Sequence, residues 1–328
     1  MTVFNDFIGN ERIREQLRYL LASGHLPHAV LLEGETGLGK RTLAREIALY
    51  LLCRGEGEKP CRECAQCRKV LKGVHPDVFE YTAEDRPKAF GIETVRDIKS
   101  NAFMQPNEAD FRVFILGNCQ SMSAEAQNAI LKLIEEPPAY AVFLMTVTTK
   151  SAMLPTVLSR STVFTLEGVS PENGAQWLCE RHEGMAYDAA LRMCRTYNGN
   201  IGKAEAALTD GNGDRISEAA GNIARAAASG SEYELLKACA VFGRDREMLQ
   251  QTLSLLKIIV RDAMAHGSGD ILSGNREAAE ALAGRLSRDK LMKTYRALEE
   301  LEQAVRRNAN MPLLMTRMCT ELLRAQNR

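Results

Sequence analysis

The sequence lacks three features that would place it in a specialised class. Its 42 basic and 42 acidic residues cancel, so no broad electrostatic field attracts a polyanion, and any nucleic-acid contact should be local or shared. No run approaches about 18 consecutive apolar residues, the length of a membrane-spanning helix. The opening "MTVFNDFIGNERIREQL" has no charged segment followed by an apolar one, as a secretory signal would. We therefore expect a cytoplasmic protein without membrane contacts.

The remaining composition is that of an ordinary globular protein. The chain has 328 residues, 45% of them hydrophobic and 26% charged, which is enough for roughly two or three domains. No internal repeat is visible. Nine cysteines are present, and in a reducing compartment an unevenly clustered set points to a metal or to buried thiols rather than to disulfides.

The first half of the chain alternates between strand and helix patterns. Apolar residues recur at helical spacing over 8–24, and "HAVLLEGETGLGKRTLAREIALYLL" reads as a strand, a glycine-rich turn and a helix. Further strands are predicted at "DVFEY", "FRVFILG" and "YAVFLMTVT", with helices around 92–103 and 123–136 and another strand after Ser161. This alternation is typical of a parallel α/β sheet.

The second half has helical patterns only. We expect a small helical unit from Pro171 to about Leu208, a polar linker at 209–214, and a longer helical region from about Asp214 to the end. Apolar stripes at helical spacing predict buried faces in the last region; their residues are Leu253, Leu256, Ile259 and Val260, followed by Leu313, Leu314, Met318 and Leu322. Periodicity does not say whether these faces bury within the chain or against a neighbour.

Residues 34–42 read "GETGLGKRT" and resemble a phosphate-binding loop. Such a loop needs glycines, so that backbone N–H groups can converge on phosphate oxygens, then a lysine for phosphate charge and a hydroxyl for magnesium. Gly34, Gly37, Gly39 and Lys40 provide the first two, whereas Arg41 stands where the hydroxyl is needed. The pattern therefore predicts the P-loop fold and leaves open whether ATP or ADP binds or the turn is purely structural.

The strand "VFILGN" ends without a carboxylate. In P-loop ATPases the corresponding strand ends in acidic residues that organise magnesium and position the attacking water. Gly117 and Asn118 can do neither, and Asp110 and Glu125 lie too far along the chain to replace them. Together with Arg41, this argues against ATP hydrolysis by the chain itself.

The segment "CRGEGEKPCRECAQC" contains Cys53, Cys61, Cys64 and Cys67. Four thiolates in one short loop, with two C-x2-C intervals, can surround a tetrahedral Zn²⁺ in a structural site. An iron–sulfur cluster, a redox pair and unligated core thiols are alternatives, and the charged loop disfavours burial. We favour structural zinc. The remaining five cysteines stand in apolar contexts typical of a core.

These segments resemble the AAA+ clamp-loader subunits of bacterial DNA polymerase III, and among them the delta-prime subunits. The resemblance is densest between residues 4 and 166 and rests on "FIGNERIREQL", "HAVLLEGETGLGKRTLA", the cysteine loop, "HPDV", "AQNAILKLIEEPP", "LPTVLSRS" and the late "NANMPLLMTRMCTELL". It implies a RecA-like AAA+ domain over 1–168 with a zinc module at about 53–67. A small helical lid over 169–210 and an all-α collar domain over 211–328 would follow.

The resemblance also implies partners and a task. A delta-prime-type subunit assembles with motor (gamma/tau) and delta subunits in a hetero-pentamer that loads the sliding clamp onto primed DNA. Its arginine, in a Ser-Arg-Cys motif, reaches ATP held by a neighbouring motor subunit. Arg160 matches that arginine, although Ser161 departs from the cysteine. Lys203 and Thr148 or Thr149 are candidates for nucleotide-sensing positions, with ordinary surface roles as the alternative.

Three other functions remain open at this stage. A gamma/tau-type motor shares the zinc loop and the arginine motif but needs a complete P-loop and an acidic strand end. A free-standing AAA+ ATPase, such as a remodeller or helicase, needs the same acids. An interaction scaffold with a decayed nucleotide fold needs neither.

Overall fold

The computed structural model describes residues 4–82, 90–209, 212–266, 271–306 and 309–327. The chain divides into two compact units, Met1–Val169 and Ser170–Arg328. The first contains a β-sheet covered by helices, and the second is helical throughout its described residues. This distribution confirms the fold class predicted from the sequence.

The sheet of the first unit has five parallel strands in the order β2-β3-β4-β1-β5. Their bounds are β1 Ala29–Glu33, β2 Val78–Thr82, β3 Arg112–Gly117, β4 Ala141–Val147 and β5 Thr162–Thr165. Every residue of β3 and β4 is buried. Continuous apolar runs suit these central strands because helices cover both faces of the sheet.

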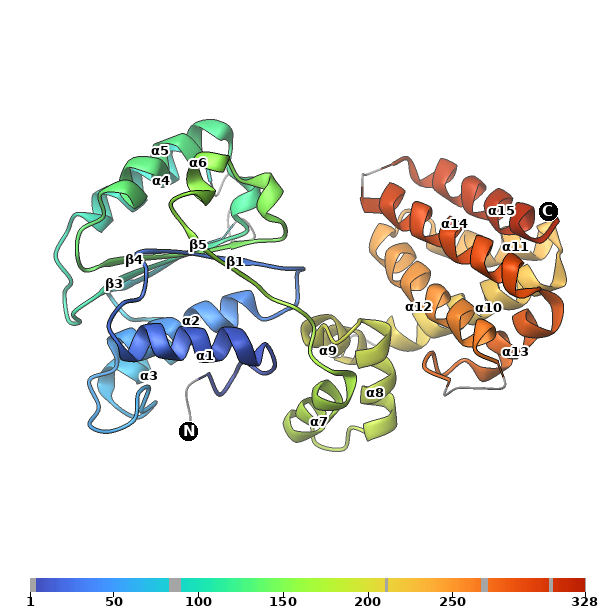
Figure 1. Ribbon diagram of the computed structural model, residues 1–328, viewed down its shortest axis with the longest axis horizontal. Helices are drawn as coiled ribbons and strands as arrows, with labels where there is room; N and C mark the ends of the chain where they lie inside the picture. The colour runs from blue at the N-terminus through green and yellow to red at the C-terminus, as the bar shows by residue number, and fades with distance from the viewer. Residues whose placement is uncertain (1–3, 83–89, 210–211, 267–270, 307–308, 328) are drawn as a thin grey trace. The chain divides into compact units, whose positions relative to one another are not determined.

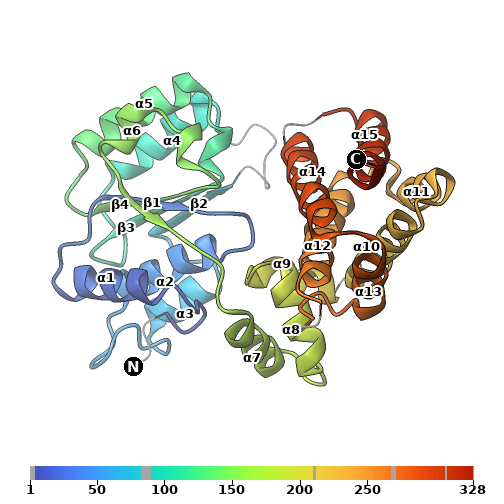
Figure 2. The same cartoon turned by 45° about the vertical axis from the view of Figure 1, so that its right-hand side comes forward.

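Three helices lie on each face of this sheet (Figures 1 and 2). One face carries α1 (Glu11–Ala22), α2 (Lys40–Leu52) and α3 (Ala65–Leu71); the other carries α4 (Ile92–Ala102), α5 (Ala124–Glu135) and α6 (Pro155–Leu158). Side chains alternate along β3, so that Val113 and Ile115 pack on the first face and Phe114 and Leu116 on the second. Short 3-10 turns, η1 (Cys119–Ser121) and η2 (Lys150–Ala152), follow β3 and β4.

Helix α5 has well-defined ends. The Ser123 side chain accepts a hydrogen bond from the N–H of Ala126 at 3.2 Å and caps the N-terminus. Two prolines, Pro137 and Pro138, follow Glu136 and prevent continuation. The predicted apolar face is buried, as the helix packs on the sheet through Ala126, Ile130, Leu133 and Ile134. This packing fixes where the polar residues of α5 lie.

Because the strands are parallel, all their C-terminal ends lie along one side of the sheet, called the carboxyl edge, and all their N-terminal ends along the other, called the amino edge. The strands are parallel, so the P-loop after β1, Asn118 after β3 and Thr148 after β4 all lie at the carboxyl edge. Arg160 lies in the turn between α6 and β5 and precedes the first residue of β5, which places it at the amino edge. The end of α5 leads into β4 and so reaches the amino edge as well.

In the second unit, α7 (Pro171–Arg181), α8 (Tyr187–Thr196) and α9 (Ile201–Thr209) share a small core of their own. A larger core joins α10 (Asn212–Ser229), α11 (Glu232–Cys239), η3 (Ala240–Phe242), α12 (Arg246–Met264), α13 (Arg276–Arg285), α14 (Arg288–Arg306) and α15 (Met311–Asn327). The separate cores agree with a lid followed by a collar domain, but the division at residue 210 stays a prediction.

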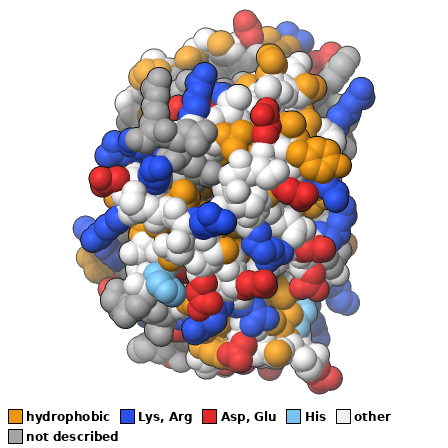
Figure 3. All heavy atoms as spheres, turned by 90° about the vertical axis from the view of Figure 1, so that its right-hand side faces the viewer, with side chains coloured by type: hydrophobic (Ala, Val, Ile, Leu, Met, Phe, Trp, Pro, Cys, Tyr) orange, Lys and Arg blue, Asp and Glu red, His pale blue; other side chains and the backbone are white. Residues whose placement is uncertain are grey.

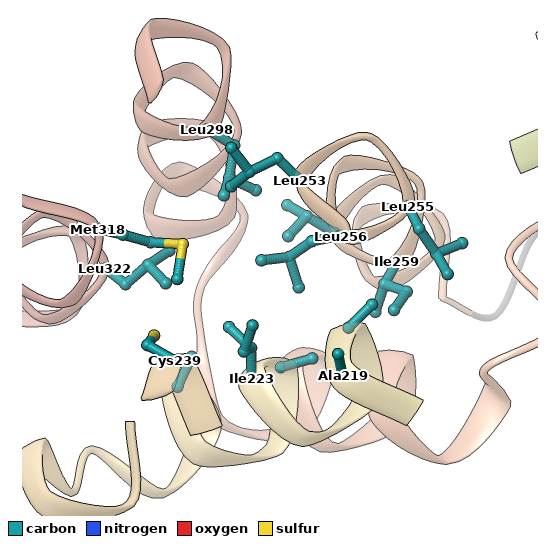
Figure 4. Close-up of a cluster of buried hydrophobic side chains, with 14 of the residues drawn as sticks. Ala219, Ile223, Cys239, Leu253, Leu255, Leu256, Ile259, Leu298, Met318 and Leu322 are labelled. Carbon is teal, nitrogen blue, oxygen red and sulfur yellow. The ribbon is translucent and has the colours of Figure 1, made fainter. Parts of the chain in front are cut away.

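The apolar stripes of the last helices pack within the unit itself. Figure 4 shows Leu253 and Leu256 of α12 gathered with Ile223 of α10 and Leu298 of α14, and all four are buried. One stripe residue was assigned wrongly, because Leu313 is 70% exposed. The buried positions Leu314, Met318 and Leu322 recur every four residues, so Leu313 is turned about 100° away from their face.

The expected linker at 209–214 is also corrected in part. Helix α9 extends through Thr209 and α10 begins at Asn212, so the polar "NGD" stretch belongs to the start of a helix. Residues 210–211 lie outside the described residues. Asp214 in the first turn suits a helix N-terminus, where a negative charge is favourable.

The face of the second unit shown in Figure 3 has Lys and Arg side chains interspersed with Asp and Glu. This agrees with the balanced charge of the sequence and gives no large field of one sign on that face. Among the residues that the structure describes, no helix combines the length and apolarity of a bilayer crossing.

Candidate functional site

Four cysteines after α2 bring their sulfur atoms together. The Sγ atoms of Cys53, Cys61, Cys64 and Cys67 lie within 4.8 Å of one another. Tetrahedral Zn²⁺ with Zn–S bonds of about 2.3 Å separates its sulfurs by about 3.8 Å, so a small contraction would complete such a site. Gly55 allows this crowding, because a Cβ there would lie 2.5 Å from the Sγ of Cys61. A metal ion between the four thiols stays a prediction.

Backbone N–H groups donate to three of these sulfurs, whereas burial and the Cys64 side chain raise the pKa of the fourth, that of Cys67. The N–H of Cys61 donates to the Sγ of Cys53 at 3.3 Å, and the N–H of Cys64 donates to the Sγ of Cys61 at 3.3 Å. Burial alone would raise the pKa of the Cys64 thiol, but hydrogen bonds from the N–H groups of Cys67 and Arg54 lower it to about 6. Thiolates are the metal-binding form, so this environment favours a cation.

The cysteine module is attached to the rest of the unit by polar side chains. Arg62 pairs with Asp6 at 2.8 Å and with Glu46 of α2, whose side chain is buried. On the other side of the module, the His75 ring and the Gln66 side chain of α3 form a 2.7 Å hydrogen bond. The module is therefore held against α2, the same helix that begins at the P-loop.

The P-loop has the backbone conformation that its glycines allow. The φ angles of Gly34, Gly37 and Gly39 are 152°, 95° and 76°, a region that other residues rarely adopt. Lys40 is buried, and its ammonium donates to the carbonyl oxygens of Gly34 and Glu35 at 2.5 and 2.7 Å. The structure thus brings together the predicted loop residues, while nucleotide binding by them stays a prediction.

Arg41, at the magnesium position, is tied to the sheet. Its Nη2 donates to the Glu80 carboxylate at 2.8 Å, and the Nε of Arg45, one turn later in α2, donates to the same carboxylate at 2.6 Å. Burial opposes ionisation, but the hydrogen bonds from Arg45 and Arg41 hold the pKa of Glu80 below its usual value. A cation paired with β2 therefore replaces the hydroxyl that would bind magnesium.

The end of β3 is packed in a way that leaves little room for an acid. A Cβ at Gly117 would lie 2.9 Å from Cγ2 of Thr82 on the neighbouring strand. Asn118 adopts the left-handed conformation, with φ 60° and ψ 46°, and its N–H donates to the Thr146 hydroxyl at 3.0 Å. Asparagine tolerates this conformation better than most residues. The missing carboxylates are thus accompanied by local packing that fits their replacements.

The two candidate sensor positions lie in different units. The N–H of Thr148 donates to Oε1 of Gln120 at 3.3 Å, beside the end of β3. In the second unit, the N–H of Lys203 donates to the Asn200 side chain at 3.2 Å. A role of either residue in sensing nucleotide stays a prediction.

Arg160 is held by its own chain at the amino edge. Its Nε lies 2.7 Å from Oε1 of Glu135, the last residue of α5. Its Nη1 donates to the carbonyl of Thr156 at 3.1 Å and to the hydroxyl of Ser159 at 3.3 Å. Ser161, which replaces the cysteine of the motif, donates to the Val157 carbonyl at 2.9 Å. The loop is therefore ordered by local bonds, and the arginine side chain stays 40% exposed.

Two structural residues were not singled out by sequence reasoning. Asp77, fully buried, accepts hydrogen bonds from the N–H groups of Asn107, Glu108 and Ala109 at 2.6, 2.8 and 3.0 Å. Its carboxylate therefore fixes the loop that leads into β3. The "HPDV" segment was noticed only as part of a resemblance, and a carboxylate directly before a strand was the available signal.

Gln127 is the second structural residue that sequence reasoning did not single out. Its amide accepts from the N–H of Leu154 at 2.7 Å and donates to the carbonyls of Ala152 and Met122 at 3.3 and 3.4 Å. It is buried and joins α5 to the segment that carries Arg160. A glutamine among the apolar positions of the α5 pattern was the signal that sequence reasoning passed over.

The parallel sheet, the P-loop after β1 and the helices on both faces define the first unit as a P-loop α/β domain of the AAA+ type. Residues 9–170 match the family described as "DNA polymerase III, delta subunit". This part of the chain is therefore similar to DNA polymerase III clamp-loader subunits, and the curated relatives include gamma and tau subunits.

Curated relatives match about half of the chain. The DNA polymerase III subunit gamma of Buchnera aphidicola (subspecies Acyrthosiphon pisum) is 34% identical over 170 residues, covering 52% of this chain and 46% of the relative. The subunit tau of Escherichia coli K12 is 34% identical over 170 residues, covering 52% of this chain and 26% of the relative. This chain therefore matches less than half the length of either relative.

A solved structure also covers most of the chain. The DNA polymerase III gamma subunit-related protein of Thermotoga maritima aligns with 95% of this chain and 100% of its own, at 16% identity and a TM-score of 0.49. The sheet order and the P-loop, rather than this distant likeness, define the fold described above.

Proposed function

We propose that this chain is a non-hydrolysing, delta-prime-type subunit of the bacterial clamp loader, and that it supplies Arg160 to ATP bound by a neighbouring motor subunit. The observation that carries the proposal is the position of Arg160. It stands before β5 at the amino edge of the sheet, whereas the chain's own P-loop follows β1 at the carboxyl edge. The four residues of β5 alone span about 13 Å. An arginine so placed serves a phosphate of another subunit more readily than one in its own loop.

The chain's own nucleotide site supports the part of the proposal that says the chain does not hydrolyse ATP itself. Arg41 replaces the magnesium hydroxyl and is paired with Glu80, and Gly117 and Asn118 replace the acids at the end of β3. Hydrolysis needs a carboxylate or an equivalent group to position water and metal. The partial P-loop would serve, at most, to hold ATP or ADP without turning it over.

The chemistry supplied to the partner is electrostatic. A guanidinium that approaches the γ-phosphate stabilises the negative charge that spreads over its oxygens in the transition state, and such arginines increase rates by about 10³–10⁵. The partners we propose are motor (gamma/tau) and delta subunits in a hetero-pentamer, which acts on the sliding clamp and primer-template DNA. The matches to DNA polymerase III subunits support this setting.

We also propose that Cys53, Cys61, Cys64 and Cys67 hold a structural Zn²⁺. The all-sulfur donor set, the clustered Sγ atoms and the N–H donors to them support zinc over harder cations, which prefer oxygen. A closed set of four ligands leaves no position for a substrate, so the ion would stabilise the module and take no part in chemistry.

A gamma/tau-type motor is the second candidate. The names of the curated relatives favour it, because those described here are gamma and tau subunits. It requires that the P-loop bind Mg-ATP with Arg41 turned away and that another group replace the missing acids. The two candidates therefore differ in one property, which is whether the chain alone turns over ATP.

The deciding experiment is steady-state ATP hydrolysis by the purified chain with excess Mg²⁺, alone and then mixed with motor and delta partners, clamp and primed DNA. We expect no turnover by the chain alone and turnover by the mixture. Robust magnesium-dependent hydrolysis by the chain alone would establish the motor function instead. The Lys40→Ala variant should then lose this activity, which excludes a contaminating ATPase as its source.

A further inference from the structure

Arg160 makes three polar contacts with its own chain, two hydrogen bonds and one ion pair. A guanidinium has five N–H donors in one plane. The Nε of Arg160 lies 2.7 Å from Glu135, and its Nη1 donates to Thr156 and Ser159 at 3.1 and 3.3 Å. Because the group is rigid and planar, these contacts together determine where Nη2 lies.

The Nη2 group remains for a partner. Among the residues that the structure describes, none accepts a hydrogen bond from Nη2, and the side chain is 40% exposed. The N–H groups of Nη2 belong to a charged donor, which suits the oxygens of a phosphate. The arginine is therefore oriented before a phosphate arrives, which lowers the entropy cost of forming the complex.

Glu135 has the most specific part in this arrangement. It is the last residue of α5, whose buried face fixes it to the sheet, and the contacts of Gln127 join the same helix to the loop before α6. Exposed ion pairs contribute little to stability, so the pair between Glu135 and Arg160 has little value as a structural bond. The pair instead affects the direction of the Arg160 guanidinium, since it holds Nε and leaves Nη2 for a phosphate.

We propose that Glu135 is a positioning residue for Arg160, one that keeps the guanidinium oriented toward ATP on the neighbouring subunit. This inference rests on the proposed function. Removing the carboxylate leaves the arginine in place but lets the guanidinium rotate about its side-chain torsions. The partner's turnover number should fall while its KM for ATP and the affinity between the subunits stay unchanged.

The test uses the complete chain assembled with motor and delta subunits, the motor carrying a substitution of its own trans-acting arginine, so that turnover reports Arg160. We expect Glu135→Gln to lower kcat about fivefold without changing KM. Glu136→Gln, a charge-matched change one residue later at another exposed position, should leave kcat unchanged. Glu135→Asp, which keeps the charge on a shorter side chain, should recover part of the loss.

Arg160→Ala separates failure of the inference from failure of the proposed function. If Arg160→Ala leaves kcat unchanged, both fail. If it lowers kcat but Glu135→Gln behaves like Glu136→Gln, only the positioning role is overturned. The double variant Arg160→Ala/Glu135→Gln should match Arg160→Ala alone. A further loss in the double variant, or weaker subunit binding by Glu135→Gln, would assign Glu135 a structural role instead.

Discussion

The two edges of the sheet use their arginines in opposite ways. At the carboxyl edge, Arg41 stands at a phosphate-binding loop but is committed to Glu80 of the same chain. At the amino edge, Arg160 contacts Glu135 through Nε, and no described residue accepts a hydrogen bond from its Nη2. Arg41 is paired with a carboxylate that also binds Arg45, whereas Arg160 keeps a side chain that is 40% exposed.

Under the proposed function, a hydrolytic fold is retained without its chemistry. The strands, the loop and the covering helices are all needed to place α5, α6 and Arg160, whichever residues stand in the nucleotide site. The fold of the carboxyl edge would then be maintained by packing, while the proposed function at the amino edge would depend on Arg160 and the residues that hold it.

The largest predicted effect concerns the cysteine module. It tests whether the two faces of the sheet are stabilised independently of each other. We expect Cys64→Ser to abolish metal binding and to lower the free energy of unfolding by on the order of 5 kcal/mol. Hydrogen exchange should increase in α2 and α3 but not in α5 and α6. Metal analysis and exchange mass spectrometry check this, with Cys179→Ser as the control.

Equal loss of protection on both faces of the sheet would show that the module supports the whole unit. Stoichiometric zinc in the purified wild-type chain is also expected, provided that chelators are avoided. Absence of any metal would remove the assignment of the four cysteines as ligands.

The next prediction concerns Asp77, at the amino edge. Asp77→Asn should cost about 3 kcal/mol, because a buried carboxylate that accepts three backbone N–H bonds becomes a neutral amide. Burial opposes ionisation, but those N–H groups keep the pKa of Asp77 below its usual value. Its contribution is therefore complete above pH of about 4 and is lost as the pH falls through the lowered pKa.

Urea unfolding between pH 3 and pH 7 measures this effect. The stability of the wild-type chain should fall toward acid more steeply than that of Asp77→Asn, and the curves should converge. Parallel curves would mean that Asp77 has an ordinary pKa in the folded chain.

A smaller effect on stability is expected at the end of β3. It tests whether packing against Thr82 excludes a larger residue, such as an acid, at Gly117. Gly117→Ala should destabilise the chain by about 1–3 kcal/mol, because the new Cβ meets Thr82 at 2.9 Å. The pair Gly117→Ala/Thr82→Ser should recover most of this loss, since the Cγ2 methyl is removed. Thermal unfolding of the four variants measures the coupling, and additive losses would show that Thr82 is not the obstacle.

The smallest effect is expected at Glu80. Glu80→Gln should cost less than about 1 kcal/mol, because Arg41 and Arg45 are 42% and 48% exposed and solvent screens the pairs. It should leave the turnover of the assembled complex unchanged. A loss of turnover as large as that expected from Arg160→Ala would mean that the carboxyl edge takes part in the chemistry.

The sequence was sufficient where the signal is local. Continuous apolar runs predict the parallel strands, and the spacing of Cys61, Cys64 and Cys67 predicts a shared cluster with Cys53. The glycines of the P-loop fix their own backbone conformation. Each of these depends on residues within one short segment, so a single sequence contains the whole pattern.

The sequence was insufficient where distant residues meet. Glu80 is 39 positions from Arg41, and Glu135 is 25 positions before Arg160, and no periodicity connects such pairs. The role of Thr82 beside Gly117 likewise depends on strand order. Leu313 was assigned to a buried face because it is apolar, although the packing of α15 turns it outward.

The most direct test of the central claim is the rate of ATP hydrolysis by the motor partner in the assembled complex, with its own trans-acting arginine substituted, comparing the wild-type chain with Arg160→Ala. The account predicts a loss of at least about 100-fold. The control variant Arg54→Ala, which removes another exposed arginine of the same unit, should have no effect. An unchanged rate with Arg160→Ala would contradict the account.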